Sequence, residues 1–438
     1  MLKRLMTAAF VLLTTSTTLV AQEASDLERR LRDLEQKVAQ MQTAQPSTDL
    51  AEIRRQIEIL GQEIESLKNG ESEKSVTADL AADTAQYGLG AAASKVYRSN
   101  PGVAIGGYGE MIYENRQGEL ASADSLRAVV YTGYKFNDRV LFNSELEVEH
   151  ANLERGGNVE LEFAYLDYLI RPEVNVRTGL MLLPVGLTNE QHEPTAFLGA
   201  RRPAVEDRII PSTWSDLGAG VFGDVGHTSY RAYLVTGLNS AGFGPEEGIR
   251  EGRQAGGEAT AEDWAAVGRL DWHAVEGTML GGSLYSGNSG QGAGFGGRVT
   301  IAEVHAQSRF RGALLRALYT RGTLDDAAAI NAANGLEGED SVGSRFGGWY
   351  VEGGYELTSL FGRGDMSLTP YARYESLDTQ RSVPAGFSRN PANEGTIFTL
   401  GFAFKPISQT VIKVDWQNVE NEANTGSDQW NIALGYIF

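Results

Sequence analysis

Residues 409–419 read Gln-Thr-Val-Ile-Lys-Val-Asp-Trp-Gln-Asn-Val (QTVIKVDWQNV), so apolar and polar side chains alternate along them. Successive side chains of an extended strand point to opposite faces. The stretch therefore predicts a strand with Val414 and Trp416 on one face. Lys413 and Asp415 share the other face. Charges on every second residue are tolerated towards water and costly towards lipid, so we expect an apolar lipid-facing side and a polar inner side.

The same pattern recurs from residue 102 to the C-terminus. Alternating segments of about 10–13 residues, long enough for a tilted membrane-crossing strand, are separated by turn residues. We count sixteen segments: 102–114, 124–136, 138–150, 159–171, 173–184, 216–226, 228–239, 264–275, 277–287, 298–309, 311–322, 344–357, 366–377, 395–405, 409–419 and 428–438. Residues 101–438 are therefore predicted to be all-β, a 16-stranded antiparallel transmembrane β-barrel.

Short and long connections alternate between these segments. Those after segments 2, 4, 6, 8, 10 and 14 contain one to three residues, and the one after segment 12 contains eight. Those after odd-numbered segments run from 8 to 31 residues. A barrel with both ends in the periplasm has tight turns on that side and long loops outside. The lengths of the connections thus favour a barrel over a soluble sandwich.

Face alternation also predicts which charged side chains point inwards. One segment is irregular, because alternation puts Asp167 on the same face as Leu161 and Phe163. Either Asp167 lies near a membrane interface or the assumed register is wrong there. The lumen-lining candidates are Arg127, Lys135, Glu145, Glu147, Glu149, Arg177, Arg373, Glu375, Lys413 and Asp415.

The composition excludes several functional classes. The net charge is −19, and residues 101–438 contain 26 Lys and Arg against 43 Asp and Glu. Nucleic-acid binding requires a basic surface, so it is disfavoured. The absence of Cys excludes thiol nucleophiles and Cys-ligated metals. No Ser/His/Asp set can be assembled, so we expect no enzymatic activity, no cofactor and no bound metal.

The N-terminus has the pattern of a secretory signal peptide over residues 1–21. Lys3 and Arg4 precede an apolar run over 5–20, and Ala21 follows it. This charged start, apolar middle and small-residue end is typical of a cleaved signal. The run is too short and too rich in Thr and Ser for a membrane-spanning anchor.

Residues 22–69 are predicted to form a periplasmic α-helical coiled coil. Apolar residues with heptad spacing occur at Leu27, Leu31, Leu34, Val38 and Met41, and again at Ile53, Ile57, Leu60, Ile64 and Leu67. Pro46 lies between the two blocks and interrupts the helix. A parallel oligomer and a helical hairpin both fit, and the oligomer is favoured because short amphipathic helices need a partner. Residues 70–100, rich in Ala, Ser, Gly and Asp, are predicted to be a flexible tether.

The last nine residues are Trp-Asn-Ile-Ala-Leu-Gly-Tyr-Ile-Phe, and Tyr436 and Phe438 lie on one face of the predicted strand. The segment resembles the C-terminal assembly signal of bacterial outer-membrane barrels, with Ala433 in place of the usual Gly. The resemblance implies an outer-membrane location, contact with lipid and lipopolysaccharide, and recognition by the barrel-assembly machinery.

Three further stretches resemble the phosphate-selective porin (O and P) family. They are Gly106–Glu110 (GGYGE), Gly179–Leu187 (GLMLLPVGL) and Asn189–Pro194 (NEQHEP), with Trp214 before a Gly-rich segment. The resemblance covers the whole barrel and implies a homotrimeric pore. Anion-selective members of that family line their pores with arginines and a lysine cluster. This barrel departs from that pattern, because its only lysines are Lys135, Lys405 and Lys413.

The longest connection, residues 185–215, is the third external loop. In general porins the third long loop folds into the lumen and forms a constriction. The candidate constriction residues are Glu190, Glu193, Arg201, Arg202, Glu206, Asp207 and Arg208. A loop that packs on the barrel wall or reaches a neighbouring subunit fits equally well. His192, with Glu190 and Glu193, is a weak metal motif because it offers one imidazole, and a solvated loop is favoured.

The sequence therefore predicts an outer-membrane porin, a passive diffusion channel for small hydrophilic solutes and ions. Its acidic barrel indicates a weak preference for cations. The first alternative is an anion- or phosphate-selective porin. The second is an envelope tether, in which the coil reaches towards the cell wall and the barrel is an anchor.

Overall fold

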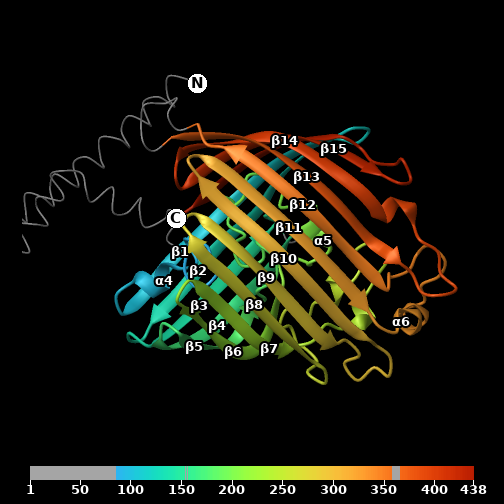
Figure 1. The fold of residues 1–438 in the computed structure, drawn as a ribbon, viewed down its shortest axis with the longest axis horizontal. Coiled ribbons are helices and arrows are strands. Elements are labelled where there is room, and N and C mark those ends of the chain that lie inside the picture. The colour runs from blue at the N-terminus through green and yellow to red at the C-terminus, as the bar shows by residue number, and fades with distance from the viewer. Residues whose placement is uncertain (1–84, 153, 155, 358–365) are drawn as a thin grey trace, which may run out of the picture. The chain divides into compact units, whose positions relative to one another are not determined.

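The structure, a computed structural model, describes residues 85–152, 154, 156–357 and 366–438. The predicted signal peptide, the predicted coiled coil and the tether up to residue 84 lie outside the described residues. Within them, sixteen antiparallel strands form a closed barrel (Figure 1). No described helix is long and apolar enough to cross a membrane.

Each of the sixteen predicted segments coincides with an observed strand. The strands are β1 Gly102–Arg116, β2 Ser122–Lys135, β3 Val140–Glu149, β4 Asn158–Arg171, β5 Val174–Leu182, β6 Ser215–Val225, β7 Thr228–Thr236, β8 Trp264–Val275, β9 Thr278–Asn288, β10 Arg298–Phe310, β11 Ala313–Leu324, β12 Arg345–Tyr355, β13 Ser367–Ser382, β14 Glu394–Ile407, β15 Thr410–Asn421 and β16 Gln429–Ile437. The helices are α4 Lys95–Arg98, α5 Ala204–Arg208 and α6 Ala327–Ala333, and the 3₁₀ turns are η3 Ser240–Gly242, η4 Arg250–Gly252 and η6 Pro391–Asn393.

The barrel closes between its first and last strands. Every strand pairs with its neighbour in sequence, and β1 also pairs with β16. The Phe438 N–H donates to the Gly107 carbonyl at 2.9 Å, and the Gly107 N–H donates to the Phe438 carbonyl at 3.0 Å. Closure leaves no strand with a row of unpaired backbone groups.

The outer surface of the barrel is apolar. Along β16 the side chains of Trp430, Ile432 and Leu434 are exposed, whereas the intervening Asn431 and Ala433 are buried. This period of two recurs in β15, where Ile412 is exposed and Lys413 is buried, as the sequence predicts. The charged face of the strands therefore points inwards.

A β-bulge on β4 corrects the predicted register of this strand. Glu145 pairs with Phe163 and Leu146 pairs with Leu161, so Glu162 is an extra residue opposite β3. The bulge reverses the alternation, so that Leu161 faces outwards while both Glu162 and Phe163 are buried. Beyond the bulge, every second side chain up to Asp167 also points inwards. Asp167 is therefore an interior residue, and strict alternation was wrong for this strand.

The tether prediction is wrong for residues 85–100, which pack inside the barrel. Leu89, Val96 and Tyr97 are buried in the same cluster as inward-facing strand residues. The Asn143 amide donates to the Ala93 carbonyl at 2.9 Å. Small residues let this segment lie close to the strand backbones, which a linker-like composition does not reveal.

The loop between β5 and β6, residues 183–214, lies within the barrel and not on its outside. The Ala200 N–H donates to Asp415 Oδ2 on β15 at 2.7 Å, and the Val205 N–H donates to Glu375 Oε2 on β13 at 3.2 Å. Apolar side chains, including Trp214, anchor both ends of the loop in the buried cluster. Of the two arrangements left open by the sequence, the structure has the loop in the lumen.

Candidate functional site

The functional region of a barrel is its interior, and two segments share it here. Residues 85–100 and loop 183–214 meet at Glu193, whose Oε1 accepts the backbone N–H groups of Ala92 and Ala93 at 2.9 and 3.0 Å. Gly90 is required at this junction, because a Cβ there would collide with the Glu193 carboxylate. Burial raises the pKa of Glu193, and the backbone donors partly oppose this rise.

Glu206 fixes the middle of the loop. This buried carboxylate accepts the N–H groups of Leu187 and Thr188, both at 2.7 Å, and the Thr188 hydroxyl at 3.0 Å. Its second oxygen accepts the Tyr350 hydroxyl of β12 at 2.7 Å. Glu206 thus joins two parts of the loop to the opposite wall.

Glu190 belongs to a buried ion-pair network. It lies 3.0 Å from Arg231 Nη1 and 3.9 Å from Arg269 Nη1. Both arginines also pair with Asp271. The carboxylate predicted to line the constriction is therefore engaged with the wall.

The remaining predicted constriction residues are more exposed. Arg201 pairs with Glu114 at 2.6 Å, and Asp207 pairs with Arg250 at 3.0 Å. Arg202 donates to the Thr213 hydroxyl at 2.8 Å. The Arg208 side chain is exposed. These groups carry the charge that is partly exposed near the loop.

Arg177 is fully enclosed. It lies 2.9 Å from Asp167 and also donates to the Tyr97 hydroxyl at 2.9 Å. Its guanidinium stacks over the rings of Tyr165 and Phe222, at 4.0 and 4.8 Å from the ring centroids. The Tyr97 hydroxyl, from the inner segment formed by residues 85–100, thereby completes the set of partners around the Arg177 guanidinium on β5.

Across the barrel, Arg373 lies between two carboxylates, Glu375 at 2.8 Å and Glu352 at 3.3 Å. The Lys413 ammonium lies 3.5 Å from the centroid of the Phe197 ring. Asp415 accepts hydrogen bonds from loop residue Ala200 and from Tyr371 and Asn431 of the wall. The predicted lining residues on β13 and β15 thus hold the loop in place.

Arg127 on β2 forms ion pairs with three glutamates: Glu147 at 3.3 Å, Glu110 at 3.5 Å and Glu149 at 3.8 Å. Lys135 donates to the Ser99 carbonyl at 3.0 Å. All ten lumen-lining candidates therefore lie on the inner face. Most of them contact protein groups, because residues 85–100 and loop 183–214 occupy the space beside them.

The interior is strongly acidic. Among the described residues, the buried charged side chains comprise fifteen Asp and Glu against five Arg and Lys. An excess of fixed negative charge attracts cations and repels anions. The balance of buried charge therefore has the same sign as the net charge of the sequence.

Sequence reasoning missed a second buried cluster around His305. Its Nδ1 lies 2.6 Å from Glu303 Oε1 and its Nε2 lies 2.8 Å from Asp271 Oδ1. The signal was present, since Glu303 and His305 alternate with apolar residues in one predicted segment.

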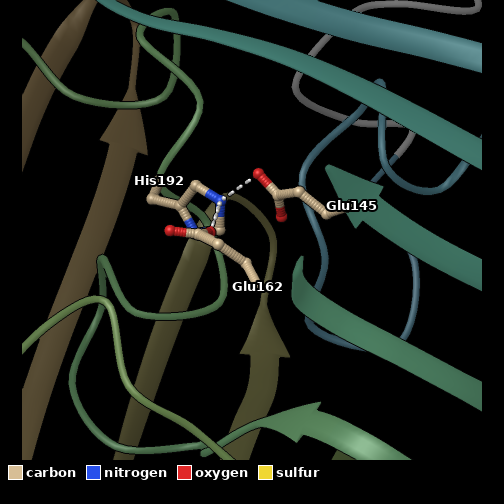
Figure 2. Close-up of side chains that lie close together, drawn as sticks. All are labelled: Glu145, Glu162 and His192. Carbon is tan, nitrogen blue, oxygen red and sulfur yellow. Dashed lines mark hydrogen bonds and ion pairs between the residues drawn. The ribbon is translucent and has the colours of Figure 1, made fainter. Parts of the chain in front are cut away.

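His192 differs most from its prediction. It is buried and not solvated, and its ion pairs are with neither Glu190 nor Glu193. Instead its Nε2 lies 3.2 Å from Glu145 Oε1 and 3.4 Å from Glu162 Oε2 (Figure 2). Burial lowers the pKa of His192. Glu162 was not among the predicted lining residues, although its position between Leu161 and Phe163 places it on the inner face by alternation.

Comparison with known proteins gives one relative in sequence and several in fold. No family model matches the chain. An uncharacterized protein of Aquifex aeolicus (strain VF5) is 35% identical over 364 residues, which is 80% of this chain and 83% of that protein.

Several solved structures are similar to the chain at low identity. Salmonella typhi OmpF in complex with daunomycin is 12% identical, with a TM-score of 0.49 over 77% of this chain and 97% of its own. The anion-selective porin of Comamonas acidovorans is 10% identical, with a TM-score of 0.49 over 77% and 99%. The outer membrane channel DcaP of Acinetobacter baumannii is 12% identical, with a TM-score of 0.49 over 78% and 99%. At such values, function has to be argued from this chain's own residues.

Proposed function

We propose that this chain, which belongs to the same family as the Aquifex aeolicus protein, is a narrow outer-membrane channel for small cations. The observation that carries the proposal is a closed barrel, apolar outside and acidic inside, with a long loop folded across its interior. The proposal assigns no catalytic residues to the chain.

The outer-membrane location follows from the barrel surface. In lipid every backbone N–H and C=O needs an internal partner, and a closed barrel supplies one for each. The exposed residues Trp430, Ile432, Leu434 and Tyr436 present an apolar face to lipid. Lipid and lipopolysaccharide are the proposed surroundings, and the aromatic C-terminal strand is the proposed element for recognition by the assembly machinery.

Loop 183–214 is the proposed constriction. It contacts β3 through His192, β12 through Glu206 and β15 through Ala200, so it reaches across the barrel. Residues 85–100 fill part of the remaining space. A channel with this much protein in its lumen should pass small ions and exclude larger solutes.

The proposed cation preference rests on the balance of buried charge described above. An anion channel needs a basic lining, and the five buried Arg and Lys side chains of the described residues are each held against carboxylates or an aromatic ring. The anion- or phosphate-selective alternative is therefore disfavoured.

Single-channel recording in a planar bilayer under a KCl gradient tests the proposal. We expect small current steps and a reversal potential on the side of K⁺. Glu149→Gln removes a half-buried inner charge, and should shift the reversal potential towards zero. Glu119→Gln, at an exposed loop position, is the matched control and should shift it less. Purified folded protein without conductance would contradict the channel, and a reversal potential on the side of Cl⁻ would restore the anion alternative.

The tether alternative can be separated by two deletions. Deleting residues 22–84 removes the predicted coil and should leave conductance unchanged while altering attachment of the envelope if the coil contacts the cell wall. Deleting residues 22–100 also removes the inner segment packed beside Asp167 and Glu193, so conductance should rise. Equal conductance of the two deletions would show that the inner segment does not narrow the channel.

The proposed homotrimer rests on the family resemblance and on the heptads of residues 22–69. Light scattering of the purified protein in detergent, corrected for bound detergent, should give the mass of three chains. The mass of one chain would contradict the trimer.

A further inference from the structure

A group of three side chains lies where loop 183–214 meets β3 and β4. Glu145 comes from β3, Glu162 from the bulge of β4, and His192 from the loop (Figure 2). All three are buried, and one ligand atom of each lies within 4.8 Å of the others. Bulges commonly re-aim side chains, and here the bulge leaves two consecutive residues, Glu162 and Phe163, on the inner face.

The spacing of the atoms suits a tetrahedral metal ion. His192 Nε2 lies 3.2 Å from Glu145 Oε1 and 3.4 Å from Glu162 Oε2. Ligands about 2.0–2.1 Å from a zinc ion at tetrahedral angles lie about 3.3 Å apart. These two separations match this edge, and all three ligand atoms lie within 4.8 Å of one another, which is compatible with a shared ion.

The imidazole is oriented as a ligand would be. Its Nδ1 lies 2.9 Å from the Asn189 carbonyl oxygen, which can only accept, so Nδ1 carries the hydrogen. Metal-binding histidines usually donate their second N–H to a backbone carbonyl or carboxylate in this way. When the imidazole is neutral, this leaves the lone pair on Nε2, which lies beside both glutamates.

Each of the two glutamates also has one carboxylate oxygen that accepts no hydrogen bond from the residues described. Glu145 Oε2 and Glu162 Oε2 are buried without a hydrogen-bond donor among the described residues. A buried polar atom without a partner needs an explanation, and a bound ion is one that would serve both glutamates. In the part of the chain that the structure describes, His192 is the one basic side chain within ion-pair distance of either glutamate.

The residues around the site carry more acidic than basic groups. Arg127, on the neighbouring strand β2, is already shared by Glu110, Glu147 and Glu149. Arg202, on the loop, interacts electrostatically with Glu145 but forms no ion pair with it. Carboxyl groups thus outnumber arginines around the site, since Glu193 of the loop is also close to Glu145, and an uncompensated buried charge is costly. A divalent ion would offset part of this excess.

We propose that Glu145, Glu162 and His192 form a binding site for a divalent transition-metal ion, with Zn²⁺ as the best-fitting occupant. One nitrogen and two carboxylate oxygens suit Zn²⁺ better than Ca²⁺ or Mg²⁺, which prefer oxygen ligands alone. The ion fastens the loop to the β3–β4 wall. This assignment is independent of channel activity, because it concerns how the interior is held together.

The test measures zinc directly. Full-length protein is folded in detergent with Zn²⁺, free metal is removed by gel filtration, and bound zinc is measured by mass spectrometry. We expect about one zinc ion per chain. His192→Ala and the isosteric Glu162→Gln should each retain at least tenfold less.

His305→Gln is the matched control. His305 is also buried between two carboxylates, but each of its ring nitrogens faces one of them, so no lone pair is left for a metal. It should retain as much zinc as the wild type. Heat-dependent migration on electrophoresis verifies that each variant is folded.

Two results would overturn the proposal. The first is a folded wild type that retains no zinc, which would mean that the group is an imidazolium shared by two glutamates. The second is zinc retained equally by Glu162→Gln, or lost equally by His305→Gln. X-ray absorption of the zinc-loaded wild type, which needs no variant, should show an imidazole in the first shell at about 2.0 Å, and a shell without imidazole would also contradict the site.

Discussion

At the scale of single residues, the stability of the interior depends on charged side chains that are buried away from water. Arg177 and Asp167 are both almost completely buried and pair at 2.9 Å. Each partner compensates the desolvation of the other, so the loss of either leaves a charge that the site cannot hydrate. Tyr97 joins the pair through its hydroxyl, and this ties residues 85–100 to the strands.

We therefore expect Asp167→Ala to lower the free energy of unfolding by about 3–5 kcal/mol, the usual effect of removing one partner of a buried ion pair. Glu119→Ala, which removes the partner of the exposed Arg116, should cost about 0–1 kcal/mol. Urea unfolding of the barrel in lipid vesicles measures both. Similar costs for the two variants would show that water reaches Arg177.

At the scale of elements, the strands were predictable and their irregularities were not. A period of two is a local property of the sequence, so the inward placement of Glu145 and Lys413 followed from alternation. The bulge at Glu162 depends on its partner strand, and the burial of His192 depends on the path of a loop. Residues 85–100 were misjudged because small residues are typical of both linkers and tightly packed segments.

Loop 183–214 should depend on Glu206. Glu206→Ala removes the acceptor for Leu187, Thr188 and Tyr350, and each buried donor left unpaired costs about 1–3 kcal/mol. We expect faster amide exchange at Leu187 and Thr188 and noisier open-channel current.

The matched control for this change is Asp207→Ala, which alters the neighbouring, half-exposed carboxylate of the same helix. Its exchange rates and current noise should resemble those of the wild type. If Glu206→Ala and Asp207→Ala behave alike, the loop is held by other contacts.

At the scale of the whole molecule, the two faces of the barrel have opposite chemistry. The parity of turns and loops predicted the sixteen strands because it reflects an architecture with two different ends. Sequence composition also predicted the acidity of the interior. It could not predict how much of the lumen is filled, since that depends on where two separate segments of the chain come to lie.

The apolar outer face should show a dependence on depth. Ile432→Arg, near the middle of β16, should lower stability by about 2–4 kcal/mol in lipid vesicles, because it places a charge near the bilayer midplane. Val103→Arg, near the end of β1, should cost about 0–1 kcal/mol, because the side chain reaches the interface. Both wild-type side chains are exposed. Equal costs would argue against a membrane-embedded outer face.

Closure of β1 onto β16 also has a consequence for how the protein is made. The backbone partners Gly107 and Phe438 are more than three hundred residues apart in the sequence. At a synthesis rate of about 5–20 residues per second, β1 waits on the order of tens of seconds for its partner to exist. Contacts of such high sequence separation also form slowly once the chain is complete. The nascent chain therefore has to be kept from pairing with other chains throughout this interval. We expect holdase chaperones to be needed most for shielding the unpaired edge of β1.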